Sequence, residues 1–373
     1  MLQIREPRNL RPAKAGSTLV LTDITERAGT LEVFDGHEQI WLGEDEERGL
    51  TAIVAIHDTT LGPALGGTRV WPHESFEAAL TDALRLSHGM TLKSAVAGMP
   101  FGGGKAVIIA DPRTAKTPEL LEAYAEMLLA LNGQYFTGED VGLTLADADF
   151  LRERTPNVTG TTQGGSGNPS PVTAHGVFLG IKAALAHRRG SDRLEGVTVA
   201  VQGLGSVGRT LCDKLSAEGA RLIVADIDEN RVEDAVQTLG ARVVPTGAIL
   251  SVEADVLAPC ALGGLFSEAS IPDVQAEIVA GAANNQLVRH DDARLLMERG
   301  ILYAPDYVIN GGGLINVAAE LAPGGYDRAD AMARVARIPG VLTDIFRRSD
   351  AEGRPTNDIA REIAAERLAA ARS

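Results

Sequence analysis

Cysteine is scarce in this chain of 373 residues, which contains only Cys212 and Cys260. Two thiols are too few for a disulfide-stabilised scaffold, so the expected setting is a reducing cytoplasm. Long apolar runs are missing as well, since none reaches the roughly 18 residues that a membrane-spanning helix needs. The segment 1–23 is largely polar and lacks the apolar core of a signal peptide. These absences predict a cytoplasmic protein with no membrane partner.

Basic residues are outnumbered, because 35 lysines and arginines face 50 acidic residues and give a formal net charge of −15. No basic cluster offsets this charge, so a surface for nucleic acid or for an anionic membrane is not expected. A small anionic substrate is still compatible with it, because a site can be locally positive. The seven histidines show no paired spacing typical of metal ligands, and no metal site is predicted.

What the chain does contain is ordinary for a globular protein: 45% apolar and 23% charged residues. Its length suggests two or three domains, each able to bury a core. The pattern predicts an extension without strong periodicity over residues 1–30, strands at 37–42 and 50–56, a glycine-rich loop at 62–69 and a helix over 76–89. Thr117-Pro118 predicts the start of a further helix, which ends near Asn132-Gly133.

Two lysines stand in apolar, glycine-rich surroundings between residues 90 and 109. Lys93 follows the predicted helix, and Lys105 follows three glycines and enters a predicted strand over 106–110. A lysine in apolar surroundings can have a lowered pKa, as a general base requires. The alternative is an ordinary loop lysine. A phosphate-binding P-loop is excluded, because the glycine spacing is one residue too long and Ala106 replaces the hydroxyl residue.

An acid follows another short predicted strand, over residues 134–137. The chain there reads Gly138-Glu-Asp140-Val-Gly142, so Asp140 lies between glycines at a strand end. This placement makes Asp140 a candidate site residue, and a simple turn aspartate is the alternative. Residues 159–171 are rich in Gly, Ser, Thr and Pro, and they predict a connection or hinge between domains.

A dinucleotide-binding fingerprint follows. A predicted strand over 197–202 leads into Gly203-Leu-Gly205-Ser206-Val207-Gly208 and then into a helix over 209–218. A second strand, 222–225, ends at Asp226. Only glycine lets the backbone approach a pyrophosphate, the helix N-terminus favours its charge, and an acid at this position accepts from the ribose hydroxyls. Because the same acid repels a 2′-phosphate, the pattern favours NAD over NADP.

Further strands are predicted at 241–244, 256–258, 278–280 and 301–303, which extends the fingerprint into a doubly wound parallel sheet and an α/β fold. Ligands bind outside the carboxyl ends of strands in such sheets. We therefore expect the residues at these ends to lie near the nicotinamide and the substrate: Ala258, Cys260, Asn284 and Asn310.

Read together, both lysines and these motifs make residues 35–370 resemble the leucine/phenylalanine/valine dehydrogenases of the glutamate dehydrogenase superfamily. The specific motifs are Gly-Gly-Gly-Lys105-Ala-Val, Gly-Ala-Ala-Asn284-Asn285-Gln and Tyr303-Ala-Pro-Asp-Tyr-Val-Ile-Asn310. The resemblance implies a substrate-binding and oligomerisation domain (1–158 plus a helix at 353–373), an NAD-binding Rossmann domain (159–352) and a cleft between them. It also implies a homo-oligomer, from dimer to octamer.

The resemblance further implies a role for each matching residue. Lys93 would hold the substrate carboxylate, Lys105 would be the catalytic lysine, and Asp140 would be its acid/base partner. The backbone of Gly66 and the side chain of Asn284 would contact the amino acid. Thr173 and the Gly203–Gly208 loop would contact NAD. The implied reaction is the reversible oxidative deamination of an L-amino acid to a 2-oxo acid and ammonium.

The side-chain pocket is apolar by the same resemblance, because no cation stands where glutamate dehydrogenases bind a side-chain carboxylate. Gly138 and Leu314 resemble the phenylalanine branch, whereas Gly142 and Val317 resemble the leucine/valine branch. Two alternatives to the family stay open. A hydroxy-acid dehydrogenase would pair a histidine such as His175 with a carboxylate, and a non-catalytic NAD-binding protein would have no need of the two lysines and the acid.

Overall fold

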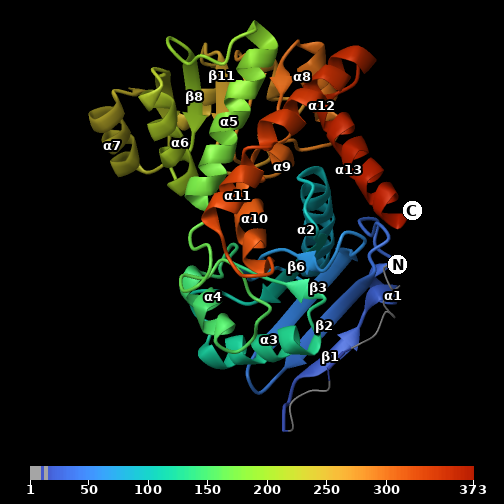
Figure 1. Cartoon of the computed structure of the whole chain (residues 1–373). Coiled ribbons are helices and arrows are strands. Elements are labelled where there is room, and N and C mark those ends of the chain that lie inside the picture. The colour runs from blue at the N-terminus through green and yellow to red at the C-terminus, as the bar shows by residue number, and fades with distance from the viewer. Residues whose placement is uncertain (1–9, 12–15) are drawn as a thin grey trace. The chain divides into compact units, whose positions relative to one another are not determined.

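The computed structural model describes residues 10–11 and 16–373, which divide into two compact units (Figure 1). The first unit comprises Met1–Asn168, Val317–Tyr326 and Arg367–Ser373. The second comprises Pro169–Asn316 and Asp327–Glu366. Within the described part of the chain, no helix combines the length and apolarity that crossing a membrane requires.

The first unit is built on a mixed sheet in the order β1-β2-β3-β6-β4-β7, with β5 also paired to β6. Its strands are β1 (Val20–Asp23), β2 (Gln39–Asp45), β3 (Leu50–Asp58), β4 (Ala64–Leu65), β5 (Thr68–Trp71), β6 (Gly102–Ile109) and β7 (Tyr135–Phe136). Its helices are α1 (Thr25–Ala28), α2 (Phe76–Val96), α3 (Pro118–Ala130) and α4 (Leu145–Arg152). The predicted extension 1–30 therefore contributes a strand and a short helix, and the part of that prediction at 1–9 and 12–15 lies outside the described residues.

Alternation along β3 and β6 gives this sheet two apolar faces. One face packs on α3 and α4 through residues such as Val54 and Ile108. The other packs on α1 and α2 through residues such as Ile53 and Val107. Lys105 is two positions before Val107 on β6, so its side chain belongs to the face that α2 covers.

On one side of β6, the partner strand is interrupted. β4 pairs with β6 at Gly102 and Gly103, and β5 resumes the pairing only at Ala106. The intervening Gly66-Gly67 segment therefore passes β6 beside Gly104 and Lys105. The predicted glycine-rich loop is thus two short strands with a break between them. Two predicted limits were wrong. Lys93 was placed after the helix, but α2 continues to Val96. The glycines 102–104 were placed before the strand, but β6 begins at Gly102.

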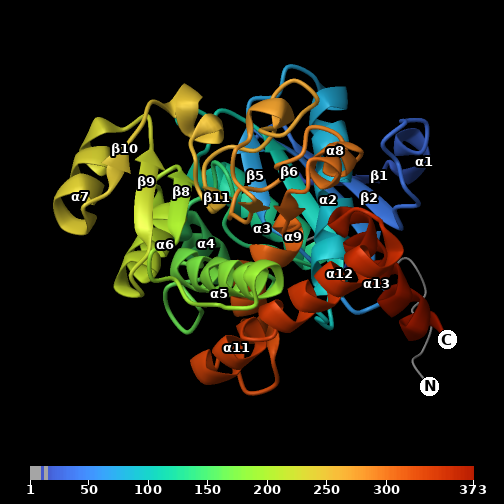
Figure 2. The same ribbon diagram turned by 90° about the horizontal axis from the view of Figure 1, so that it is seen from above.

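The second unit contains a parallel sheet in the order β10-β9-β8-β11-β12-β13, and Figure 2 shows the first four strands in this order. Its strands are β8 (Thr198–Gln202), β9 (Arg221–Ala225), β10 (Arg242–Val243), β11 (Val256–Pro259), β12 (Ile278–Val279) and β13 (Leu302–Tyr303). Its helices are α5 (Ser170–Arg189), α6 (Ser206–Ala217), α7 (Glu229–Leu239), α8 (Asp292–Glu298), α9 (Asp306–Ile309), α10 (Gly312–Ala318), α11 (Arg328–Val335), α12 (Ile338–Glu352) and α13 (Thr356–Arg372). The described part of the chain also has 3₁₀ segments at Thr246–Ser251, Ile271–Asp273 and Ala319–Leu321.

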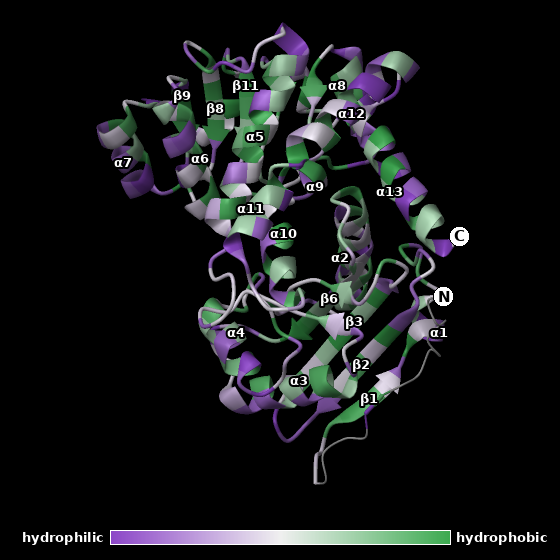
Figure 3. Ribbon diagram, viewed as in Figure 1, coloured by the Kyte–Doolittle hydropathy of each residue, from purple (hydrophilic) through white to green (hydrophobic). Residues whose placement is uncertain are grey.

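In chain order within this sheet the strands run 3-2-1-4-5-6, which is the order of a dinucleotide-binding fold. All five pairings are parallel, as the sequence predicted. The buried strands are apolar, and Figure 3 shows β8 and β11 mostly green, whereas much of α7 is purple. The division between the units falls inside α10 and inside α13. In the first unit, Arg367 from the last turns of α13 donates to the carbonyls of Ala95 and Val96 at the end of α2.

Candidate functional site

Lys105 and Asp140 meet beside the Gly66-Gly67 break between β4 and β5 of the first sheet. Nζ of Lys105 donates to Oδ2 of Asp140, although the two residues are 35 positions apart. β7 pairs with β4 and then carries the chain past the Gly66-Gly67 break to Asp140. A Cβ on Gly67 would lie 2.6 Å from the Glu139 carbonyl oxygen and 2.9 Å from the Asp140 Cβ, so glycine is what permits this approach.

The pair is shielded from water, because the Lys105 side chain is 7% exposed and that of Asp140 is 24% exposed. Burial works to raise the pKa of Asp140, but the charge and hydrogen bond of Lys105 and the charge of Arg69 outweigh it. The pKa of Asp140 is therefore held below its ordinary value. Asp140 is a carboxylate that can accept a proton from the lysine beside it.

Arg69 is a charged neighbour of this pair that the sequence reasoning missed. Its Nε lies 3.6 Å from Oδ2 of Asp140, and its Nη1 donates to the Asp82 carboxylate at 2.9 Å. The available signal was a lone arginine directly after Gly-Gly-Thr in a glycine-rich stretch. Spacing alone did not show that β5 carries it to Asp140.

Gly66 is held by a buried hydroxyl network. Tyr135 donates to the Gly66 carbonyl at 2.5 Å, and Thr68 lies 2.5 Å from both the Tyr124 and Thr137 hydroxyls. Burial raises the pKa of Tyr135 well above its ordinary value, so this donor stays neutral. A Cβ on Gly66 would lie 1.9 Å from the Gly104 carbonyl oxygen, which leaves the backbone as the only part of Gly66 that can face a ligand.

The other predicted residues of the substrate site are placed as follows. Lys93 is half-buried in the last turn of α2, the helix that covers the Lys105 face of the sheet. A Cβ on Gly138 would meet the carbonyl and hydroxyl oxygens of Thr159 at 3.1 and 3.3 Å, so the absent methyl leaves little empty volume. Val317 lies in the first unit near Gly160, whereas Leu314 is half-buried in the second unit.

In the second unit, the three glycines of the fingerprint have three different surroundings. Gly203 has φ +92° and makes the turn after β8. A Cβ on Gly208 would lie 2.0 Å from the Gly203 carbonyl oxygen, so this glycine packs the helix on the strand. A Cβ on Gly205 would find only Arg231 Nη1 at 3.9 Å, which leaves that backbone open to a ligand. These are the roles that a pyrophosphate-binding loop assigns to its glycines.

Asp226 is fixed against this loop. Its carboxylate accepts from the backbone N–H of Leu204 at 2.5 Å and from that of Asp228 at 2.8 Å. A carboxylate has about four acceptor sites, so it can still accept from ribose hydroxyls. Ile227 is 92% exposed after β9 and Leu262 is 83% exposed after β11, and both are apolar side chains that a bound base could cover. Ser206 is exposed and Val207 is half-buried in the first turn of α6.

The asparagines at the strand ends do come together. Asn310 Nδ2 donates to Oδ1 of Asn284 at 2.8 Å and to the Ala282 carbonyl at 3.0 Å. Its own Oδ1 is buried without a partner among the described residues, so it can accept from a ligand amide. Thr173 lies nearby on α5, because a Cβ on Gly313 would meet its hydroxyl at 2.5 Å.

The other predicted residues of the second unit, Ala258, Cys260 and His175, are buried or half-buried. Ala258 has no exposed surface, and burial raises the pKa of the Cys260 thiol to about 11, so it stays protonated. Both cysteines have free thiols. His175 lies beside Phe178, with ring centroids 6.3 Å apart, and no carboxylate of the described residues lies within ion-pair distance of it. This disfavours the histidine–carboxylate pair of a hydroxy-acid dehydrogenase.

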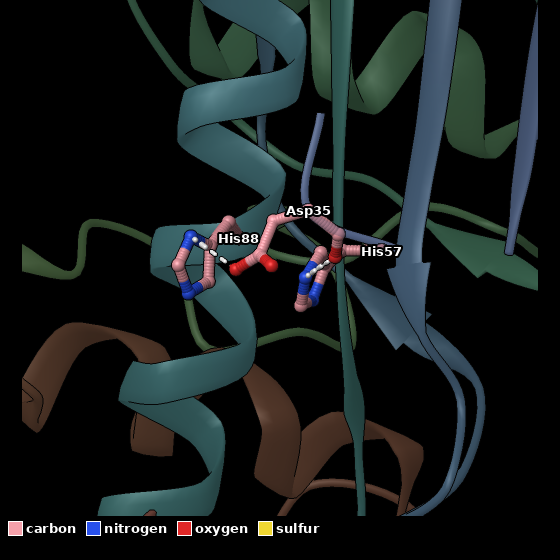
Figure 4. Close-up of side chains that lie close together, drawn as sticks. All are labelled: Asp35, His57 and His88. Atoms are coloured by element: carbon pink, nitrogen blue, oxygen red, sulfur yellow. Dashed lines mark hydrogen bonds and ion pairs between the residues drawn. The ribbon is translucent and has the colours of Figure 1, made fainter. Parts of the chain in front are cut away.

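One cluster of the first unit has metal-ligand residue types, namely Asp35, His57 and His88 (Figure 4). His57 Nε2 bonds the Asp35 carbonyl at 3.0 Å and its Nδ1 bonds the Thr91 hydroxyl at 2.8 Å, so both ring nitrogens are engaged. The His57 and His88 rings stack with centroids 4.8 Å apart. His88 Nδ1 also lies 3.5 Å from the Asp35 carboxylate, so contacts within the protein and ring stacking account for this cluster.

Comparisons with known proteins agree with this geometry. A model of the Glu/Leu/Phe/Val dehydrogenase dimerisation domain matches residues 37–157, and a Glutamate/Leucine/Phenylalanine/Valine dehydrogenase model matches residues 164–232 and 224–371. A leucine dehydrogenase of Bacillus cereus is 49% identical over 347 residues, which is 91% of this chain and 94% of the relative. A phenylalanine dehydrogenase of Bacillus thermotolerans is 42% identical over 94% of this chain and 93% of its own.

Two solved structures are similar over most of the chain. The crystal structure of L-tryptophan dehydrogenase from Nostoc punctiforme has a TM-score of 0.80 at 47% identity, covering 91% of this chain and 97% of its own. The hetero-hexameric glutamate dehydrogenase of Thermus thermophilus has a TM-score of 0.72 at 27% identity, covering 95% of this chain and 88% of its own.

Proposed function

This chain belongs to the glutamate/leucine/phenylalanine/valine dehydrogenase family, and on this premise we propose that it catalyses the NAD-dependent, reversible oxidative deamination of an apolar L-amino acid. It is an amino acid dehydrogenase, an oxidoreductase that needs a nicotinamide cofactor. The observation that carries the proposed chemistry is the shielded contact between Lys105 and Asp140. A non-catalytic NAD-binding role would not require this pair.

The chain's own residues have the following tasks. Lys93 binds the substrate carboxylate and orients the α-carbon. The substrate's amino group is neutral when the α-carbon gives up its hydride. Nζ of Lys105, in its neutral form, then removes a proton from the water that attacks the oxidised C–N bond, and the ionised Asp140 stabilises the ammonium that forms on Lys105. This proton passes through Asp140 to the departing amino group, which leaves as ammonium. A bound nicotinamide cofactor supplies the hydride acceptor.

The cofactor is held by the second unit in this proposal. The open backbone at Gly205 and the N-terminus of α6 receive the pyrophosphate, and Asp226 receives the ribose hydroxyls. Asn310 offers its unpartnered Oδ1 to the nicotinamide amide, while Asn284, Ala258 and Cys260 lie at the strand ends and Thr173 lies on α5. Asp226 favours NAD, because a carboxylate repels a 2′-phosphate.

The substrate is an L-amino acid with an uncharged apolar side chain. Leu65, just before the Gly66 contact, is 1% exposed and offers no charge to a side-chain carboxylate. The three named proteins of more than 40% identity are dehydrogenases of leucine, phenylalanine and tryptophan by their names, which supports an apolar pocket without choosing among the three, whereas the glutamate dehydrogenase is only 27% identical. Gly138 gives little support for an enlarged aromatic pocket, because Thr159 fills the space beside it.

We also propose a homo-oligomer, with the first unit and the last turns of α13 carrying substrate binding and subunit contacts. The dimerisation-domain match over residues 37–157 supports this. The two unpaired thiols agree with a reducing cytoplasm.

The test is NADH oxidation with ammonium and a panel of 2-oxo acids, those of leucine, valine, phenylalanine, tryptophan and glutamate. We expect oxidation that requires both ammonium and an apolar oxo acid. The glutamate analogue should have a kcat/KM more than about tenfold below the best substrate, a gap of more than about 1.4 kcal/mol. Oxidation without ammonium would favour a hydroxy-acid dehydrogenase, and no oxidation with any oxo acid would favour a non-catalytic role.

A further inference from the structure

We propose that Arg69, braced by Asp82, is a positioning residue that fixes the Asp140 carboxylate against Lys105. The inference rests on the proposed function, in which Asp140 and Lys105 exchange protons. It concerns a residue outside the lysine–aspartate pair, and all of its parts lie in the first unit.

The first observation is that one carboxylate oxygen faces two cations. Oδ2 of Asp140 accepts from Nζ of Lys105 and lies 3.6 Å from Nε of Arg69. Arg69 and Asp140 are 25% and 24% exposed, so water screens this interaction only in part. The guanidinium therefore acts on the same atom that takes the proton from the lysine.

The second observation is that the far end of Arg69 is fixed by another element. Nη1 donates to both carboxylate oxygens of Asp82, at 2.9 and 3.2 Å, and Asp82 lies in the second turn of α2. His73 Nε2 is 3.6 Å from the same carboxylate. The guanidinium is planar and rigid, so holding one end in place directs its Nε edge. Asp82 thereby aims Arg69 at Asp140.

The third observation is that Arg69 Nε is buried and has no hydrogen-bond acceptor among the described residues. Native structures leave few buried N–H groups unpaired, and each calls for an explanation. A modest approach of Asp140 would close the 3.6 Å separation to a hydrogen bond. Arg69 thus provides a second anchor for Asp140 when Lys105 engages the reacting atoms.

Four titratable groups interact electrostatically with Asp140. They are Lys105 on β6, Arg69 on β5, Tyr135 on β7 and the adjacent Glu139. Only Lys105 and Arg69 are cations, and both lower the pKa of Asp140. Without Arg69, Asp140 keeps its proton at higher pH and stands less firmly beside the lysine.

The experiment compares Arg69→Gln, Arg69→Lys, Asp82→Asn and the Arg69→Gln/Asp82→Asn double variant with the parent protein by the pH dependence of kcat and kcat/KM. We expect Arg69→Gln to lower kcat by at least about tenfold, part of the 10²–10⁴ that proton transfer contributes, and to move the acid limb of the profile to higher pH. Arg69→Lys should recover part of kcat, and Asp82→Asn should add little once Arg69 is replaced. An unmoved acid limb in Arg69→Gln would overturn the proposal.

The matched control is Arg27→Gln. Arg27 also pairs with an acid at the start of α2, because its Nη2 lies 3.0 Å from Glu77 Oε1, but it does not approach Asp140. This variant should leave the profile where it is in the parent. A change equal to that of Arg69→Gln would show that loss of any arginine–α2 pair suffices, and would refute the specific role.

A second readout separates this inference from the proposed function. Denaturation midpoints of Arg69→Gln, Asp140→Asn and the double variant give a coupling between the two residues that does not depend on turnover. Non-additive midpoints support the contact even if the parent oxidises no amino acid, in which case the proposed function alone fails. Additive midpoints refute the contact whatever the activity.

Discussion

Lys105 and Asp140 can touch because the backbone beside them carries no side chains. Gly67 lies so close to Asp140 that a methyl group there would overlap it, and Gly66 lies even closer to Gly104. Any substitution at these glycines would push the chain out of the break between β4 and β5. The contact between Lys105 and Asp140 therefore depends on two neighbouring glycines that have no side chains.

Lys105→Ala is the most direct test of the catalytic pair. We expect a protein that folds and binds NADH but turns over at least about a thousandfold more slowly, because a general base and its partner's effect are lost together. Stopped-flow or steady-state NADH oxidation measures the rate, and fluorescence titration measures NADH binding. A kcat near that of the parent would remove Lys105 from the mechanism.

Asp226 should decide between the two nicotinamide cofactors. The parent protein is expected to prefer NAD, and Asp226→Asn should narrow the ratio of kcat/KM for NAD over NADP by removing the charge that repels a 2′-phosphate. The variant keeps a side-chain oxygen that can accept from the Leu204 N–H, so the loop should stay in place. Equal use of NAD and NADP by the parent would mean that the acid does not face the ribose.

At the scale of helices and strands, sequence patterns located most elements but not all of their limits. Thr117-Pro118 marked the start of α3, since the threonine accepts from Leu120 N–H and the proline occupies the first turn. Gly89 suggested an end to α2, yet the helix continues through it because Ser87, Thr91 and Ser94 pack on the glycines of β6. Tertiary packing outweighed the local cost of glycine.

The contact of Arg69 with Asp140 could not be predicted from the sequence for a related reason. β4 and β5 are too short to have a strand pattern of their own, and their pairing with β6 comes from the long neighbouring strand. The second unit was easier to predict, because its strands alternate with helices and the spacing of its glycines has a known physical role in binding a pyrophosphate. Its strand order was not predicted, and it is the usual order of a dinucleotide-binding fold.

The histidines around β3 predict an acid-sensitive first unit. Burial, with the charges of His88 and His37, lowers the pKa of His57 to about 4, against weaker opposing effects of Asp35 and Asp58. Above pH 6.5 the imidazole is neutral both folded and unfolded. Between pH 6.5 and 4 only the unfolded chain binds the proton, so the free energy of unfolding should fall by roughly 3 kcal/mol over this range.

Tryptophan fluorescence can follow this effect in the first unit alone, because Trp41 and Trp71 are the chain's two tryptophans and both belong to that unit. Urea midpoints should decline as pH falls from 6.5 to 4 in the parent. His57→Gln should decline less steeply, whatever its stability at pH 7. Identical slopes in the two proteins would contradict the assignment to His57.

At the scale of the whole molecule, the first unit has surface that a monomer would leave uncovered. Among the described residues, β1 is at one end of its sheet and pairs on one side only, with β2. Val20 on this strand is 58% exposed, and Trp71 at the end of β5 is 49% exposed. An edge strand with apolar side chains is prone to further pairing unless something covers it. A second copy of the chain is the cover that the dimerisation-domain match favours.

We therefore expect sedimentation or light scattering to give a mass that is a multiple of the 39.2 kDa chain at micromolar concentration. Thermal stability should rise with protein concentration, because association stabilises the folded state by mass action. Val20→Lys places a charge on the β1 edge and should shift the assembly toward smaller species, whereas Val243→Lys, at a 45% exposed position on the edge strand of the other unit, should not. A parent protein of 39.2 kDa would refute the oligomer. A parent oligomer equally sensitive to both substitutions would keep the oligomer but remove β1 from its interface.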